Sequence, residues 1–151
     1  MPNPKIEPGQ EWFEVTNTGS TAFDLNGVGL DRANDTRAPD VVVAGGCKSL
    51  APAGFALLAR SADPATNGGL ATVDATFGFS LVNATGDVQV VDPPSCAATT
   101  PFVCTTIYAS ATYATSSDGV SLQLVPMACP GITPYGDGTN LGTPRAANVC
   151  P

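Results

Sequence analysis

The fold is decided by residues 11–30, EWFEVTNTGSTAFDLNGVGL, near the start of a chain of 151 residues. In an extended strand, Glu11, Phe13 and Val15 point to one face and the residues between them to the other. The stretch Asn17-Thr18-Gly19-Ser20-Thr21 then supplies residues typical of turns, after which an apolar pattern resumes. The pattern predicts two strands joined as a β-hairpin.

The composition disfavours helices. Charged residues make up 13% of the chain, and three Glu and two Lys are too few to build helix surfaces. Short apolar runs separated by Gly, Pro and Asn predict further strands at residues 41–44, 55–60, 77–82, 87–92, 103–108 and 120–125. We therefore expect one all-β domain over residues 1–151, a β-sandwich or barrel of about eight short, mostly antiparallel strands. Residues 127–151 are expected to wrap it irregularly.

Charge and hydropathy exclude several classes of partner. The net charge is −7 and no run of Lys or Arg is present, so nucleic acid is not an expected partner. The apolar stretches are far shorter than the roughly 20 residues of a membrane-spanning helix, so membrane insertion is not expected. Because residues 1–10 lack the apolar core of a secretory signal, we expect the chain to be cut or processed from a longer one.

The sequence predicts a protein without catalytic residues, cofactors or metals. Glu11 and Glu14 lie three apart on a strand and face opposite sides, so they cannot converge as an acid and base pair. The chain has no His, the usual base for a Ser or Cys nucleophile. Residues 31–35 together with Asp40 place three carboxylates in one loop, which leaves calcium as an alternative to a plain polar turn.

Five cysteines without a CxxC pair predict two disulfides and one remaining thiol. Cys129 and Cys150 bracket the irregular tail, and Cys96 and Cys104 flank a short segment as a clip across a hairpin would; spacing alone leaves other pairings open. Cys47 would then be a half-buried thiol or an intermolecular attachment point. Lys48 beside it could lower its pKa, but an exposed loop lysine without that effect is the favoured interpretation. Disulfides predict an extracellular, cell-surface or periplasmic location.

Five motifs, in order along the chain, resemble those of the lamin tail domain, an immunoglobulin-like β-sandwich at the end of nuclear lamins and in many bacterial secreted proteins. The first is the strand EWFEVTN with the turn GST and the segment LNGVGL, all within residues 11–30. The later ones lie in residues 50–59 (LAPAGFALLA), 79–88, 119–123 and 142–148. The resemblance implies an immunoglobulin-like sandwich with a role in interaction and anchoring.

The chain departs from the family pattern at two places. Val28 stands where the family commonly has Trp, which leaves less aromatic bulk for the interior. Residues 1–7 leave little of the usual first strand, which implies an incomplete sheet edge where another strand can add.

These observations lead to a main functional hypothesis and two alternatives. We expect a non-catalytic extracellular or cell-surface module that binds or anchors proteins, with Trp12, Glu14 and Tyr108 as candidate exposed interaction residues. Packing under the C-terminal segment is the other interpretation of Trp12, and carbohydrate is a less expected ligand of the aromatic side chains. The alternatives are a subunit that self-assembles into a fibre or surface layer through the edge near the N-terminus, and an accessory domain of a secreted hydrolase.

Overall fold

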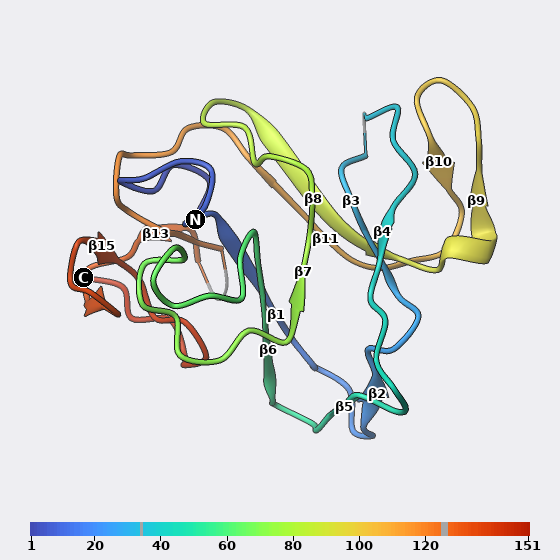
Figure 1. Cartoon of the computed structure of the whole chain (residues 1–151), viewed down its shortest axis with the longest axis horizontal. Helices are drawn as coiled ribbons and strands as arrows, with labels where there is room; N and C mark the ends of the chain where they lie inside the picture. The colour runs from blue at the N-terminus through green and yellow to red at the C-terminus, as the bar shows by residue number, and fades with distance from the viewer. Residues whose placement is uncertain (34, 125–126) are drawn as a thin grey trace.

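The computed structural model of the chain describes residues 1–33, 35–124 and 127–151. Within these ranges it contains fifteen short strands and one 3-10 turn, η1 (Pro93–Ser95), so the predicted all-β class is confirmed. Two larger sheets carry most of the long strands (Figure 1). In the β1 sheet the order is β1 (Trp12–Thr16), β6 (Phe55–Ala59) and β7 (Ala75–Thr76). In the β11 sheet it is β11 (Ile107–Tyr113), β8 (Gly86–Val91), β3 (Gly29–Asp31) and β4 (Asp40–Val41).

Four antiparallel pairs of two-residue strands complete the described structure. They are β2 (Phe23–Asp24) with β5 (Ser49–Leu50), β9 (Cys96–Ala97) with β10 (Val103–Cys104), β12 (Leu122–Gln123) with β13 (Cys129–Pro130), and β14 (Pro134–Tyr135) with β15 (Asn140–Leu141). The segment after residue 127, expected to be irregular, therefore contains three short strands. The predicted strand at 120–125 shrinks to β12, and its last residue lies outside the described residues.

The β1 sheet is buried on both faces. On one face, Phe13 and Leu58 share a core with Leu30 and Val90 of the β11 sheet. On the other face, a second core joins the β1 sheet to the loop after β6 and to the C-terminal segment; its buried members are Met1, Trp12, Leu57, Ala59, Leu70 and Tyr135. Both faces of the sheet are therefore covered around Trp12 and Phe13, whereas Thr16 at the end of β1 is exposed.

Trp12 is therefore not an exposed interaction residue, and that prediction is wrong. Its side chain is 6% exposed, and its indole Nε1 donates a hydrogen bond to the Tyr135 hydroxyl at 2.7 Å. The two rings meet edge to face with centroids 5.7 Å apart. The side chain does point away from the first core, as its position on the strand predicts, but the C-terminal segment covers it.

The predicted hairpin over residues 11–30 is also wrong, because β1, β2 and β3 lie in three different sheets (Figure 1). Asn17 explains how the chain leaves β1. Its backbone pairs with the turn at residues 53–54, while its side-chain amide donates to the carbonyls of Thr21 and Leu50 at 2.8 and 2.9 Å. Because these bonds tie the turn to β5 and β6, the chain moves on to a new sheet instead of folding back on β1.

Residues 77–82 keep the predicted alternation without forming a strand. Phe77, Phe79 and Leu81 are all buried in the first core, at 3%, 4% and 4% exposure. The backbone between them bonds to side chains instead of to a neighbouring strand. The period of two therefore identified the buried face correctly, but it does not require a sheet ladder.

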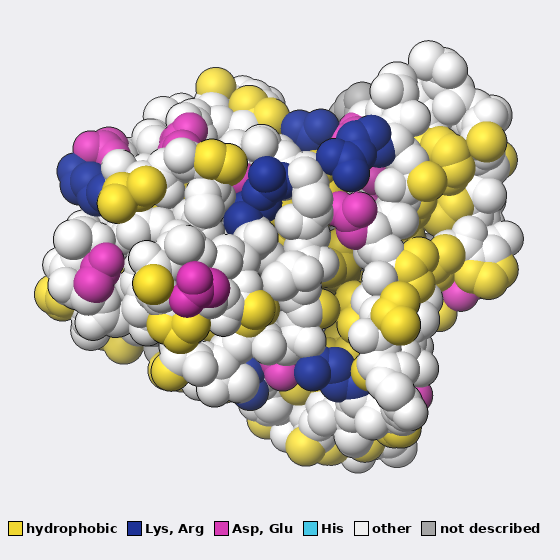
Figure 2. Space-filling model, in the orientation of Figure 1, with side chains coloured by type: hydrophobic (Ala, Val, Ile, Leu, Met, Phe, Trp, Pro, Cys, Tyr) yellow, Lys and Arg dark blue, Asp and Glu magenta, His cyan; other side chains and the backbone are white. Residues whose placement is uncertain are grey.

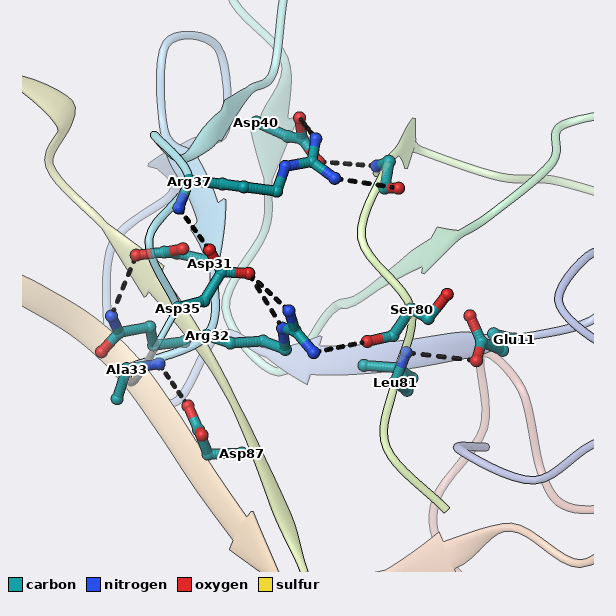
Figure 3. A network of polar contacts seen from close by, with 12 residues as sticks. Glu11, Asp31, Arg32, Ala33, Asp35, Arg37, Asp40, Ser80, Leu81 and Asp87 are labelled. Carbon is teal, nitrogen blue, oxygen red and sulfur yellow. Dashed lines mark hydrogen bonds and ion pairs between the residues drawn. The ribbon is translucent and has the colours of Figure 1, made fainter. Parts of the chain in front are cut away.

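Two arginines hold this segment against the loop between β3 and β4 (Figure 3). Arg37 donates to the Gly78 carbonyl at 3.3 Å, and the Gly78 N–H donates to the Asp40 carboxylate at 2.6 Å. Arg32 donates to the Ser80 carbonyl at 3.1 Å and forms an ion pair with Asp35 at 2.6 Å. Side chains thus satisfy polar groups that a strand would otherwise satisfy.

Two disulfides are present, Cys96–Cys104 and Cys129–Cys150, which are the pairings that spacing predicts. Cys96 and Cys104 face each other across the β9–β10 pair. Cys47 is unpaired and exposed, not half-buried as expected. Two disulfides suggest an oxidising, extracellular environment. Within the described ranges, no helix has the length and hydropathy needed to cross a membrane.

Candidate functional site

An apolar groove lies between β1 and β11, the edge strands of the two larger sheets. Its cavity volume is about 490 Å³. Apolar side chains from both sheets form much of its lining, including Val15 from β1 and Val88 and Val90 from β8. Residues 109–111 of β11 close one side, and residues 121–124 with parts of 143–148 close another. The groove is long enough to run beside β1 over all five of its residues.

The β1 edge turns unpaired backbone groups toward the open side of its sheet. Glu11 and Asn17, which flank the strand, both form backbone hydrogen bonds with the chain of β6 and its adjoining turn. Because alternate residues of an antiparallel strand face the partner, the N–H and C=O groups of Trp12, Glu14 and Thr16 point the other way. Those of Glu14 and Thr16 form no backbone hydrogen bond on that side with any residue of the described chain.

The N-terminal residue covers one end of this edge. The Met1 amino group donates to the Trp12 carbonyl at 2.6 Å, and the Trp12 N–H donates to the Met1 carbonyl at 3.4 Å. The edge near the N-terminus, where an added strand was expected, is thus partly occupied by the chain itself.

Glu14 is the one charged side chain among the described residues that line the groove. It is half-buried, and its carboxylate accepts a hydrogen bond from the Arg145 N–H of the C-terminal segment. The Arg145 guanidinium pairs in turn with Asp74. Burial raises the pKa of Glu14 to about 7, although the Arg145 hydrogen bond and charge oppose the rise. At pH 7 a carboxyl of this kind is protonated in about half of the molecules, which lowers the average charge of the groove.

The C-terminal wall of the groove is held by polar contacts and by a disulfide. Gln123 is buried, and its side-chain amide donates to the Thr143 hydroxyl at 3.1 Å. Cys129 of β13 lies in the strand that pairs with Gln123, and its disulfide to Cys150 fixes the end of the chain beside it. The wall is therefore tethered at both ends, which favours a preformed groove.

Glu11 is a buried carboxylate outside the groove. It is 1% exposed and lies beside a shallow depression formed with residues 80–84. Its Oε1 accepts a hydrogen bond from the Leu81 N–H at 3.1 Å (Figure 3). Its Oε2 lies 3.7 Å from Arg60 Nε. Burial raises the pKa of Glu11 to about 7, with the Leu81 hydrogen bond and Arg60 opposing the rise. It ties β1 to the 77–82 segment and has a structural role.

Glu11 should make the free energy of unfolding decrease as pH rises, whereas most carboxyl groups of folded proteins have the opposite effect. Because its pKa rises from 4.5 unfolded to about 7 folded, the folded state binds the extra proton in this window, and stability falls as pH rises through it. Glu11→Gln removes this effect, while Glu7, Arg60 and the Met1 amino group, which act on Glu11 electrostatically, stay in both proteins. We expect the stability of the wild type relative to Glu11→Gln to fall by up to about 3 kcal/mol between pH 4.5 and 8. Urea denaturation of both proteins across this range measures the difference, and parallel pH curves would refute the assignment.

The remaining predicted interaction residues have different environments. Tyr108 is 48% exposed, and its ring lies edge to face against Phe23 with centroids 5.2 Å apart. Glu14 is half-buried and bonded to Arg145, so it is less exposed than expected. A hydrogen bond to the Asp24 carboxylate raises the pKa of Cys47, which contradicts the less favoured alternative that Lys48 lowers it.

The loop considered for calcium is organised by ion pairs. Asp35 pairs with Arg32, Asp40 pairs with Arg37 at 3.5 Å, and Asp31 accepts a hydrogen bond from Gln89 at 3.3 Å. Asn34, in the same loop, lies outside the described residues. Among the residues that are described, no group of three or more His, Cys, Asp or Glu side chains is placed to hold a metal ion.

Sequence reasoning missed the groove and the contacts of Arg32, Arg60 and Arg145. Each of these arginines contacts a carboxylate or carbonyl far away in sequence, and a single sequence carries no signal for such pairs.

On the face shown in Figure 2, Lys and Arg side chains lie beside Asp and Glu side chains, so this face has no extended patch of one charge.

Comparisons of the chain with protein-family models, curated proteins and solved structures found no match. The resemblance to the lamin tail domain stays a prediction.

Proposed function

We propose that the chain is a lamin-tail-like, immunoglobulin-like β-sandwich that works as a non-catalytic extracellular binding module. Its ligand is an extended segment of a partner protein, which lies in the groove between β1 and β11. The observation that carries this proposal is the combination of an apolar lining with the unpaired backbone groups of Glu14 and Thr16. An extended peptide uses main-chain hydrogen bonds for affinity and side-chain pockets for specificity, and the groove offers both.

The chemistry of the groove favours protein over other ligands. The exposed surface of its lining is mostly apolar, and burial raises the pKa of its one carboxyl to about 7, which suits an apolar peptide better than a sugar or a phosphate. Trp12, the main aromatic candidate for stacking on carbohydrate, is buried against Tyr135. The absence of His from the chain and the separate neighbours of Glu11 and Glu14 support a binding role over a hydrolytic one.

A phage-displayed library of random linear peptides tests this function. We expect selection to enrich peptides with apolar residues at alternate positions, because one face of the bound strand meets the groove lining. Ala147→Arg places a long cation at an exposed position of the groove wall and should weaken binding of the selected peptides by about tenfold.

Ala146→Arg is the matched control for this experiment. Ala146 is also exposed and is adjacent in sequence, but it does not line the groove, so binding should stay at the wild-type level. An equal loss of peptide affinity in Ala147→Arg and Ala146→Arg would contradict the proposed site. Selected peptides without alternating apolar residues would contradict it as well.

A further inference from the structure

The outer edge of β11 is a long strand edge without the usual protection. β11 spans seven residues, Ile107 to Tyr113, and is the longest strand in the described chain. It lies at the margin of its sheet, next to β8 alone (Figure 1). Natural edge strands are commonly shortened, covered, or marked with Lys or Pro, because an open edge pairs with other strands. β11 contains no charged residue and no Pro, and its one irregularity is a register shift between Ile107 and Ala109.

The other edges of the two larger sheets are shorter or partly covered. β4 and β7 have two residues each, too few to template a new strand. At the β1 edge, Met1 bonds to Trp12 and the Arg145 N–H bonds to the Glu14 side chain. Along β11, by contrast, Ile107 to Ser110 and Thr112 are exposed. β11 is therefore the longest exposed edge of the two sheets, and the one long enough for a second copy to pair along seven residues.

We propose that β11 pairs with β11 of a second copy of this chain, antiparallel and about a two-fold axis at Ser110. A two-fold pair requires a strand that complements itself. The sequence Ile-Tyr-Ala-Ser-Ala-Thr-Tyr meets this requirement because small residues flank its centre and larger ones occupy both ends. With Ser110 opposite its own copy, Ala109 lies opposite Ala111 and Tyr108 opposite Thr112, an aromatic and β-branched pair that is favourable across strands.

The charge distribution fits pairing at this strand. Each chain carries a net charge of −7, so two copies repel each other as whole molecules. β11 adds no charge to the contact, and Asp87, which is opposite Thr112 on β8, is bonded to the Ala33 N–H. The association should therefore strengthen as salt screens the long-range repulsion. This inference goes beyond the proposed function, since its partner is a second copy of the chain and not a peptide, although residues 109–111 of β11 also line the groove.

Sedimentation equilibrium of the whole chain at low and high salt tests the pairing. We expect a monomer–dimer equilibrium that shifts toward dimer with salt. Ser110→Lys puts two like charges directly opposite each other and should raise the dissociation constant at least about tenfold. Ser49→Lys is the matched control, because Ser49 is an exposed strand residue in the separate β5. The dissociation constant of its dimer should equal that of the wild type. A monomer at every concentration and salt, or a dimer that Ser110→Lys leaves intact, overturns the proposal.

A cross-linking experiment detects even a weak pair. In a Cys47→Ser background, Ser110→Cys brings two thiols together at the two-fold axis, within reach of a disulfide. Mild oxidation should give a covalent dimer, whereas Ser49→Cys in the same background should stay monomeric. Failure of Ser110→Cys to cross-link faster than Ser49→Cys counts against the pairing. The peptide-binding test changes Ala147, on another wall of the groove than β11, so either idea can fail while the other stands.

Discussion

Trp12→Ala is expected to lower the free energy of unfolding by about 4 kcal/mol, the largest effect of any substitution considered for this chain. The indole is 6% exposed and lies in the second core with Leu57, Leu70 and Tyr135. Alanine would remove most of this contact and leave a cavity under the C-terminal segment, together with an unpaired Tyr135 hydroxyl. Chemical denaturation of the wild type and the variant measures the loss.

The control for this prediction is Tyr135→Phe, which keeps both rings and removes the 2.7 Å hydrogen bond alone. It should cost about 1 kcal/mol. Trp12 is the single tryptophan of the chain, so its fluorescence reports on the same core. If the fluorescence emission maximum of the native protein matched that of free tryptophan in water, Trp12 would not be buried in the second core. A Trp12→Ala variant as stable as the wild type would contradict that burial too.

Removal of the Cys129–Cys150 disulfide is the second change with a large expected effect. The bond joins residues 21 apart in sequence, and the loop-closure relation gives about 3 kcal/mol for a loop of this length. The Cys129→Ser/Cys150→Ser variant should therefore unfold at a lower temperature, by about 6–12 °C for a domain of this size. Differential scanning calorimetry of the variant against the wild type measures the shift.

Cys96→Ser/Cys104→Ser is the matched control, because this bond closes a loop of separation 8 around the β9–β10 pair. Its removal should cost less, about 2.5 kcal/mol by the same relation. The first variant should also weaken binding of groove peptides, because Cys150 fixes the end of the segment that forms the groove wall, whereas the control should not. A larger loss of stability from the shorter loop would contradict this account.

The sequence predicted which residues are buried better than which strands pair. Phe77, Phe79 and Leu81 were correctly placed on one face, since alternation reports burial directly. The partner of a strand depends on distant residues. The turn after β1 was predicted as a hairpin, but Asn17 joins it to Leu50 and to residues 53–54. No local pattern distinguishes these two outcomes.

Trp12 shows a second limit of sequence reasoning. Alternation turns it away from Phe13, and that direction is observed, but a sheet buried on both faces looks like a half-exposed one until the covering segment is known. The covering segment carries Tyr135 and lies more than a hundred residues later, in a stretch without strong periodicity. The disulfide pairings were easier to predict, because few cysteines and short separations limit the choices.

The candidate site was the least predictable part of the molecule. Val15, Val88 and Ala111 line one groove although they come from strands far apart in the sequence. The resemblance to the lamin tail domain implied an open edge, but placed it near the N-terminus, where Met1 pairs with Trp12. The lack of charged residues in β11 can be seen in the sequence. It indicates a site for strand pairing only once the structure places the strand at the edge of its sheet.

We propose that this chain binds other chains at two strand edges, a peptide at β1 in the groove and a second copy at β11. Hydrogen–deuterium exchange of residues 12–16 and 107–113 distinguishes the two, measured in dilute protein, in concentrated protein at high salt, and in dilute protein with a saturating groove-selected peptide. We expect slower exchange of the outward-facing β11 amides in the concentrated sample and of the Glu14 and Thr16 amides in the peptide sample, with β4 and β7 unchanged. Identical exchange of both segments in all three samples would show that neither edge binds another chain.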